Sequence, residues 1–322
     1  MTRRRTLLWG LALTTLGAGL AAWRWHSQSK PVATVTPIAR VYGSAPGYVG
    51  SQPCASCHRK ISESFQRTEM ARSWSLVADA PPIEQDGEVH DAKSDLHYKI
   101  ERRDEGLFVR EYLLDEEGQE IHSHEVEVSY AVGSGLHGRS YVSQDRGYLT
   151  FLPVAWYSDA GHWALSPGYE KTNIRFSRSV PPQCVGCHNA EPTFIAGSGN
   201  RYRLPLPHGI GCESCHGPGG EHVEQQRRAM TGGEQPDDAH SAIVNPARLP
   251  PDLQQDVCLQ CHLLGETVVM QPGKDTFDFR PGLRLRDYRN DFFISEQTGE
   301  RDRKSTRLNS SHSRASRMPS SA

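Results

Sequence analysis

The sequence predicts an α+β fold, in which an antiparallel β-rich region separates a first Cys-x-x-Cys-His motif from a module of loops and short helices. Two observations predict this fold. Residues 76–182 contain no cysteine and include several short runs of alternating or β-branched and aromatic side chains. Residues 183–301 hold three further Cys-x-x-Cys-His motifs, separated by short stretches with little periodicity. One part of the chain therefore forms a sheet, and the other has few regular elements.

The first 30 residues have the pattern of an export signal. Three arginines at positions 3–5 precede an uncharged apolar run from Leu7 to Trp23. The run is close to the minimum length for spanning a bilayer, and no clear small-residue cleavage site follows it. We therefore expect an uncleaved anchor in the inner membrane, with the rest of the chain in the periplasm or otherwise outside the cytoplasm.

The charge of the chain excludes one class of partner. Residues 31–301 carry 26 Lys and Arg against 37 Asp and Glu. A nucleic-acid-binding protein needs a basic face, which this acidic body does not provide. We expect no nucleic-acid partner.

All eight cysteines fall in four Cys-x-x-Cys-His motifs, the pattern typical of covalent c-type haem attachment. Two thiols at this spacing reach one porphyrin edge and form thioethers, and the adjacent histidine coordinates the iron. The sequence therefore predicts four covalent haem c groups. In chain order, the motifs are Cys54/Cys57/His58 (motif 1), Cys184/Cys187/His188 (motif 2), Cys212/Cys215/His216 (motif 3) and Cys258/Cys261/His262 (motif 4).

Other uses of paired cysteines explain the motifs less well. Cys-x-x-Cys pairs also form zinc sites, redox dithiols and, in exported chains, disulfides. None of these uses requires a histidine directly after the second cysteine, and here all four pairs have one.

The second axial ligand of each iron is less sharply predicted. His137 lies in the glycine-rich segment "GSGLHGRSY", and His222 follows the turn "CHGPGG". His208 precedes motif 3 by four residues, so it would reach a neighbouring haem rather than its own. Met70 is a further candidate, for the first haem, although core packing is the commoner role of such a methionine. His162 is a minor candidate. The remaining histidines of residues 76–301 are expected on the surface: His90, His97, His122, His124 and His240.

The elements follow from local patterns. Residues 59–74 after motif 1 predict an amphipathic helix with Ile61, Phe65 and Met70 toward one side. The region 76–182 predicts about five to seven antiparallel strands. The strand-like runs are 96–103, 107–114, 125–132, 139–144 and 148–157, with turns at 115–120 and 144–148. Residues 240–266 suggest a brief helix leading into motif 4.

The last 21 residues resemble translated adapter sequence. "DRKSTRLNSSH" and "SRMPSSA" match, in order, an in-frame reading of a common sequencing adapter. We therefore expect the natural chain to be interrupted near Arg301. The predicted organisation is signal or anchor 1–30, linker 31–52, motif 1 segment 53–75, β-rich region 76–182, module of motifs 2–4 183–301, and artefact 302–322.

Two segments carry a family resemblance. "YVGSQPCASCH" (48–58) and "IGCESCHGPGGEH" (210–222) resemble the multihaem cytochrome c family that includes the tetrahaem electron carrier of hydroxylamine oxidation. The resemblance implies a distal-ligand role for His222. In that family a histidine commonly follows the first haem histidine by twelve positions, where this chain has Met70.

A wider resemblance covers residues 48–293. "LSPGYEK", "IVNPARL", "CLQCHLLGE" and "FRPGLRL" resemble exported bacterial multihaem proteins that often continue into tetratricopeptide repeats. It implies that such repeats followed residue 301 and bound a protein partner.

Three functions are compatible with these features. The first is an electron carrier that exchanges electrons with redox partner proteins. The second is a reductase or other oxidoreductase of a small nitrogen or sulfur compound, acting at a haem with an open distal site, with Arg72 and Arg139 as anion-binding groups. The third is a haem-bearing scaffold for a lost repeat domain. Whether the protein is an enzyme stays open at this point.

Overall fold

The computed structural model describes residues 41–42, 47–104, 106–190, 192–234, 242–263, 265, 267–294 and 301–304. The predicted export signal, most of the linker, and the tail after residue 304 lie outside these residues. Within the described part, no helix has the length and apolar character needed to cross a bilayer.

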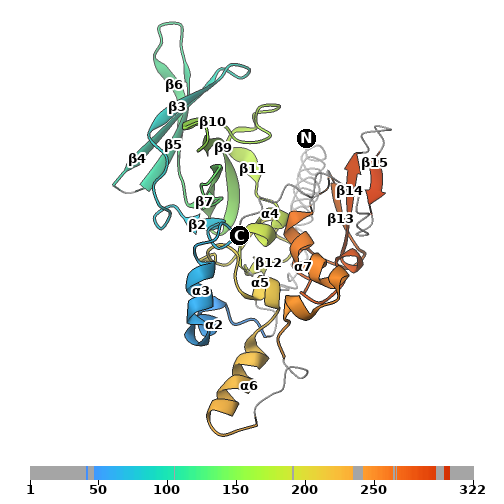
Figure 1. The fold of residues 1–322 in the computed structure, drawn as a ribbon. Helices are drawn as coiled ribbons and strands as arrows, with labels where there is room; N and C mark the ends of the chain where they lie inside the picture. Colours follow the sequence, from blue (N-terminus) through green and yellow to red (C-terminus); the bar gives the residue numbers. More distant parts are fainter. Residues whose placement is uncertain are drawn as a thin grey trace, which may run out of the picture. The chain divides into compact units, whose positions relative to one another are not determined.

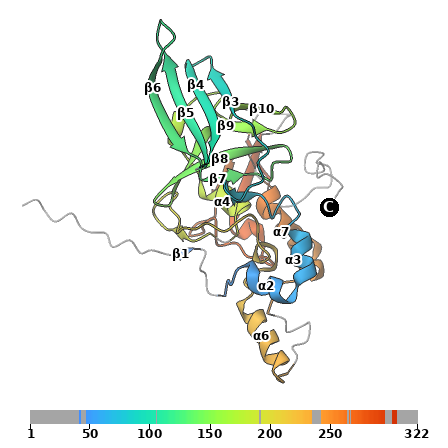
Figure 2. The same ribbon diagram turned by 90° about the vertical axis from the view of Figure 1, so that its left-hand side faces the viewer.

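The β-rich region contains a four-stranded antiparallel sheet in the order β3-β4-β5-β6. Figure 2 shows these strands side by side in that order. The exposed strand β6 carries His122 and His124 on a solvated surface, as predicted. The strands are β3 (Gly87–Asp91), β4 (Leu96–Arg103), β5 (Gly106–Leu114) and β6 (Glu120–Glu127).

A second sheet of six strands continues the region (Figure 1). Its order is β10-β9-β8-β7-β2. Strand β11 also pairs with β9, at Thr150 and Phe151, whereas β10 pairs with the C-terminal half of β9. All its pairs are antiparallel. The strands are β2 (Trp74–Leu76), β7 (Tyr130–Val132), β8 (Gly138–Asp145), β9 (Tyr148–Tyr157), β10 (His162–Leu165) and β11 (Arg178–Ser179).

The strand predictions are confirmed for four of the five runs and wrong in number. The run 125–132 is wrong, because it is divided between β6 and β7, which belong to different sheets. The runs 96–103 and 148–157 coincide with β4 and β9, and the two predicted turns join β5 to β6 and β8 to β9. The described region holds ten strands, β2 to β11, where five to seven were expected. The missed strands are only two to five residues long, which is too short for a clear alternation of apolar and polar side chains. In β3, polar side chains also obscure the alternation.

One apolar core joins the two sheets. Tyr98 and Ile100 of β4 are fully buried, and they pack in one cluster with Tyr141 of β8 and Val154 of β9. Trp163 of β10 crosses between the sheets and donates its Nε1–H to the carbonyl of Gln85, at 2.6 Å. Burial of each large apolar side chain stabilises the fold by about 1.5–3 kcal/mol, so this region has a core of its own.

The remaining part has the predicted short helices, and it also has short strands that were not predicted. Two small sheets accompany the helices: β1 (Val41–Tyr42) pairs with β12 (Phe194–Ile195), and β14 (Arg289–Ile294) lies between β13 (Thr267–Met270) and β15 (Arg301–Lys304). The helices are α2 (Ser51–Cys57), α3 (Arg59–Phe65), α4 (Pro182–His188), α5 (Glu213–His216), α6 (Gly220–Met230) and α7 (Pro251–His262). Short 3₁₀ turns are Arg175–Ser177, Pro246–Arg248 and Leu285–Asp287.

The predicted helix after motif 1 is shorter than expected. Helix α3 ends at Phe65, and a series of turns follows as far as Ser73. Thr68 promotes this ending, because its hydroxyl bonds to the carbonyl of Phe65 and accepts the N–H of Ala71. Met70 therefore lies in the turns and not on the helix, and its side chain is 43% exposed.

A second apolar cluster connects the β-rich region to the helical part. Trp74, Val142 and Leu149 of the six-stranded sheet pack with Val185 of α4 and with Phe277. The turn between β8 and β9 also approaches the later chain, since the Tyr202 N–H donates to the Gly147 carbonyl at 2.9 Å. Gly147 has φ of 87°, and a Cβ there would lie 2.1 Å from the Tyr202 carbonyl oxygen, so only glycine fits.

Candidate functional site

Each of the four motifs lies on or beside a short helix. The thiols of motif 1 are in α2, and His58 stands between α2 and α3. Motif 2 lies within α4, motif 3 at α5, and motif 4 at the end of α7. Residues three apart share one face of a helix, so this local structure turns both thiols of a motif the same way. All eight thiols are free of disulfide bonds.

Thiols of different motifs are neighbours in space. Burial, helped by the nearby Cys212 thiol, raises the pKa of Cys54 to about 11. Burial and the neighbouring Cys258 thiol likewise raise the pKa of Cys215. The Cys187 and Cys261 thiols are also close, and their interaction raises the pKa of Cys261 and lowers that of Cys187. These three proximities place the motifs in the spatial order 1-3-4-2, which differs from their order in the sequence.

Glu213, the first residue between the two cysteines of motif 3, holds motif 1 against motif 3. Its side chain is buried, and its carboxylate accepts backbone N–H groups from Gly50 at 2.7 Å, Gly219 at 2.8 Å and Val49 at 3.0 Å. Three fixed donors around one carboxylate form a strong, directional anchor. The N-terminus of α2 is thereby fixed to motif 3.

The backbone around motif 3 packs without room for side chains. The Cys212 N–H donates to the Ser51 hydroxyl at 3.1 Å, which adds a second bond between motifs 1 and 3. A Cβ at Gly211 would lie 2.9 Å from the Ala190 Cβ and 3.0 Å from the Ser51 oxygen. Glycine at this position therefore permits the chain segments of motifs 1, 2 and 3 to meet.

Motif 4 is attached to motifs 2 and 3 through Gln260. The side-chain amide of Gln260 donates to the Ser214 carbonyl at 2.9 Å, inside motif 3. Its backbone carbonyl accepts from the Cys187 thiol of motif 2 at 3.6 Å. Arg289 of β14 then donates to the carbonyls of Gln260 at 2.8 Å and Leu259 at 3.1 Å, satisfying the C-terminal end of α7.

Motifs 1 and 2 are joined by a further bond. The Ser73 hydroxyl, after motif 1, donates to the backbone carbonyl of His188 at 2.8 Å, although the two residues are 115 positions apart. The Asn189 amide donates to the Pro207 carbonyl nearby. The chain thus returns to the same place before and after the β-rich region.

His216 has the arrangement of an oriented metal ligand. Its Nδ1 lies 2.8 Å from the backbone carbonyl oxygen of Val244, a hydrogen bond that places the proton on Nδ1. Metal-binding histidines are commonly oriented by such a bond, which leaves Nε2 as the electron-pair donor. His188 differs, because its Nδ1 is buried without a hydrogen-bond partner among the described residues, and burial lowers its pKa.

His58 of motif 1 faces His222 across a gap. Their ring centroids are 6.5 Å apart, and the ring planes differ by 20°. Metal–nitrogen bonds of about 2.0 Å on both sides of one metal ion would place two imidazole centres about 6.3 Å apart. Burial, with the nearby charges of His58 and His216, lowers the pKa of His222, and its Nδ1 is buried without a partner in the described chain. The pair therefore has the spacing that two axial ligands of one iron require.

The helices around motif 1 bury none of their own side chains. None of the residues of α2, α3 or α6 is buried, and Ile61 is 69% exposed. Short helices depend on tertiary packing for stability. A large apolar group attached at motif 1 would supply the missing contact surface, so the residues present fit a haem.

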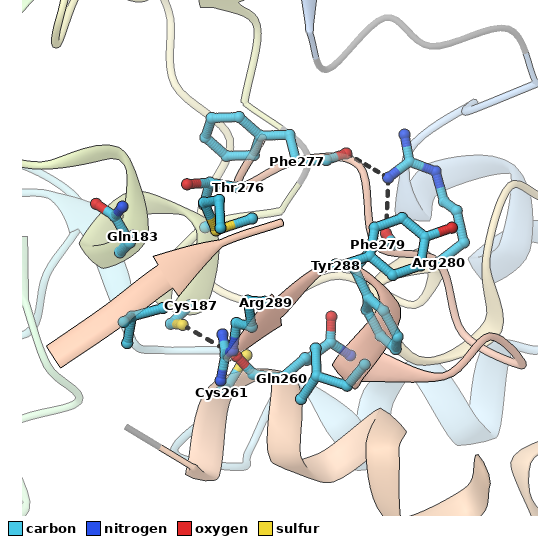
Figure 3. A pocket seen from close by; sticks show the side chains of 14 residues that line it. Gln183, Cys187, Gln260, Cys261, Thr276, Phe277, Phe279, Arg280, Tyr288 and Arg289 are labelled. Atoms are coloured by element: carbon cyan, nitrogen blue, oxygen red, sulfur yellow. Dashed lines mark hydrogen bonds between the residues drawn. The ribbon is translucent and has the colours of Figure 1, made fainter. Parts of the chain in front are cut away.

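A pocket between motifs 2 and 4 has a fitting lining (Figure 3). Cys187 and Cys261 reach it from one side, and the aromatic rings of Phe277 and Tyr288 contribute apolar wall. Arg280 lies at its edge, where its guanidinium donates to the Phe279 carbonyl at 2.8 Å. The pocket thus combines one thiol from each of two motifs with an apolar wall, beside the place where the groups attached at motifs 2 and 4 would lie.

The other predicted ligands lie elsewhere. His137 is an exposed residue before β8 with Nδ1 3.1 Å from Asp159. His208 is paired with Asp79 at 3.4 Å, close to the chain that follows motif 1. The exposed side chain of Met70 has no described contact with a motif histidine. Ligation by these three residues stays a prediction.

The two proposed anion-binding arginines are both engaged. Arg139 is buried, donates to the Pro81 carbonyl at 2.8 Å, and forms an ion pair with buried Glu84 at 3.4 Å. Arg72 pairs with Glu69 at 2.9 Å on the surface. The expectation for Arg139 is wrong, because a buried guanidinium in an ion pair has no face open to a substrate.

This arrangement defines a protein built to attach haem covalently at several neighbouring points. The family model described as cytochrome c554 and c-prime matches residues 165–217, which include motifs 2 and 3. The match supports a multihaem c-type cytochrome with covalently bound haem c.

A solved structure, the outer cell wall cytochrome OcwA, is similar to the chain, with 17% sequence identity and a TM-score of 0.45. The similarity covers 76% of this chain and 44% of that one, so this chain spans less than half of its length. No curated protein matches the chain.

Proposed function

We propose that the protein is a tetrahaem electron carrier that works outside the cytoplasm. The observation that carries this proposal is the series of hydrogen bonds that Glu213 and Gln260 make with neighbouring motifs, which joins all four motifs. Bound haem c supplies reversible one-electron chemistry. The chain contributes the spacing, because the attachment points of successive groups lie near one another.

Each type of motif residue has one proposed role. The eight cysteines would attach the four groups, and His58, His188, His216 and His262 would be the proximal ligands. His222 would complete the coordination at motif 1. Covalent attachment of haem c takes place outside the cytoplasm, which agrees with the arginine-led apolar segment at the N-terminus, the proposed membrane anchor. Redox proteins are the proposed partners.

Spectroscopy of the holoprotein tests the carrier proposal against the reductase alternative. We expect four haems per chain, all low-spin when oxidised, and all reversibly reduced. Addition of nitrite or hydroxylamine should leave the spectra unchanged and produce no turnover. A high-spin haem that binds and consumes either compound would overturn the carrier proposal.

The order 1-3-4-2 makes a separate prediction. Removing motif 3 by Cys212→Ala and Cys215→Ala should leave motif 1 joined to the others only through Ser73 and the His188 carbonyl. Electron equilibration within the protein after a substoichiometric reducing pulse should then become biphasic. Removing motif 2, at the end of the series, by Cys184→Ala and Cys187→Ala should leave one fast phase. Equal kinetics in the two variants would contradict this order. Far-ultraviolet circular dichroism checks that both variants fold.

His222→Ala tests the ligand role at motif 1. Loss of the distal imidazole should convert one haem to the high-spin state, and His222→Met should raise its reduction potential, because methionine ligation raises the potential relative to histidine. Optical spectra and redox titration measure these changes.

His124→Ala, an exposed change on β6, is the matched control for this substitution. Four low-spin haems with unchanged potentials in His222→Ala would show that His222 is not a ligand.

A further inference from the structure

The β-rich region brings together two histidines and an aspartate that the sequence separates into ordinary surface positions. His90 is on β3, His97 is on β4, and Asp95 is in the turn between them. One ligand atom from each residue lies within 4.8 Å of the others. These residues are distant in the sequence from all four haem motifs and have no part in the electron-carrier proposal.

The register of the hairpin creates the histidine pair. His90 and His97 are directly opposite each other on adjacent antiparallel strands. Their ring centroids are 4.2 Å apart and their planes differ by 12°. Side chains directly opposite on two strands share one face of the sheet. Both imidazoles therefore present their nitrogens on the same side of the hairpin.

Asp95 completes the cluster from the turn. Its Oδ1 lies 2.9 Å from Nε2 of His90. Asp95 has φ of 58°, a left-handed conformation that aspartate tolerates better than most residues. Tetrahedral coordination with metal–ligand bonds of about 2.0–2.1 Å would place ligand atoms about 3.4 Å apart. Metal binding therefore requires side-chain rotations that turn the two stacked imidazoles toward one point.

A buried residue holds the turn in this shape. The side chain of Asp91 accepts from the Ser94 hydroxyl at 2.6 Å and from the Asn173 amide at 2.9 Å. The backbone N–H of Asp95 also donates to the Asp91 carbonyl at 2.8 Å. The hydrogen bonds of Asp91 thus fix the turn that carries Asp95.

The other side of His97 is also supported. Its ring stacks on Tyr112 of β5, with centroids 5.2 Å apart and planes differing by 19°. Tyr112 is buried, so the His97 ring rests on a fixed surface, and its other face is stacked on the ring of His90. Support of this kind, behind the ligands, is what orients a metal site.

We propose that His90, Asp95 and His97 form a binding site for a divalent transition metal, of the Zn²⁺, Cu²⁺ or Ni²⁺ class. Two imidazoles with one carboxylate suit these ions and not Ca²⁺ or Mg²⁺, which prefer oxygen ligands. His90 and Asp95 are exposed to solvent. The remaining coordination positions are therefore open to water or to a ligand from outside the chain.

Isothermal titration of the holoprotein with zinc chloride tests the proposal. We expect the unaltered protein to bind one Zn²⁺ per chain at this site. Each of the variants His90→Asn, His97→Asn and Asp95→Asn should lose this binding or bind Zn²⁺ at least tenfold more weakly. Asparagine also tolerates the left-handed backbone at position 95, so Asp95→Asn should keep the turn.

Two controls make the test specific. His122→Asn and His124→Asn, which remove exposed histidines of β6 in the same sheet, should leave the zinc titration unchanged. Haem absorption spectra should not shift on zinc addition, which separates this site from the haem ligands. Unchanged stoichiometry and affinity in all three cluster variants, with intact circular dichroism, would overturn the proposal.

Discussion

Protein made without haem attachment is expected to lose helices α2, α3 and α6 and to keep the β-rich region. None of the residues of these three helices is buried by the chain itself. Helices of this length are marginal in water without tertiary contacts. The two sheets, by contrast, share a core that includes fully buried Tyr98, Ile100 and Val154.

Hydrogen exchange measured by mass spectrometry checks this expectation. The chain should be produced in a host without the c-type haem maturation system, and its exchange compared with that of the holoprotein. Amides of α2, α3 and α6 should exchange at the rate of an unfolded chain, and those of β4, β8 and β9 should stay protected. Protection of α6 in the haem-free protein would show that haem is not its missing contact surface.

The second large effect is expected for Glu213→Ala. The substitution leaves the N–H groups of Val49, Gly50 and Gly219 without the carboxylate that accepts them. Hydrogen bonds to a charged group contribute about 1.5–3 kcal/mol each, and their effects are not additive. We expect the free energy of unfolding of the holoprotein to fall by about 3 kcal/mol or more. Guanidinium unfolding followed by circular dichroism measures it.

Two further variants sharpen the Glu213 experiment. Glu213→Gln keeps an acceptor oxygen without the charge, so its loss of stability should be intermediate. Glu221→Ala removes an exposed glutamate in the same segment of chain and should change stability by less than about 0.5 kcal/mol. A Glu213→Ala protein as stable as Glu221→Ala would contradict the anchoring role.

Local patterns predicted much of the fold, and the reasons are physical. Strands such as 148–157 combine length with aromatic and β-branched side chains, and this signal does not depend on distant contacts. The end of α3 at Phe65 escaped prediction because apolar spacing continued to Met70, while the Thr68 side chain competed for the backbone. Short strands such as β2 and β11 exist only through their partners, which no local pattern contains.

In the candidate site, too, local sequence patterns predicted some residues and not those that depend on distant contacts. The Cys-x-x-Cys-His motifs are local signals and were visible in the sequence, and His222 was marked by the turn before it. Glu213 was missed because its partners, Val49 and Gly50, are more than 160 positions away. The only available signal was an acidic side chain between two thiols, a position that most often faces solvent. The approach of His90 to His97 likewise depended on the exact register of β3 and β4.

The bond between Ser73 and His188 has a consequence for how such proteins diversify. The bond brings together the two ends of the β-rich region, so this region is an insertion that begins and ends at one place beside the motifs. The entropic cost of closing a loop rises only with the logarithm of its length. Lengthening or exchanging the inserted region therefore changes the free energy of folding little, provided that the apolar cluster around Trp74 is kept. Recombination would therefore combine the part of the chain that holds the four motifs with different side domains, without changing the spatial order of the motifs.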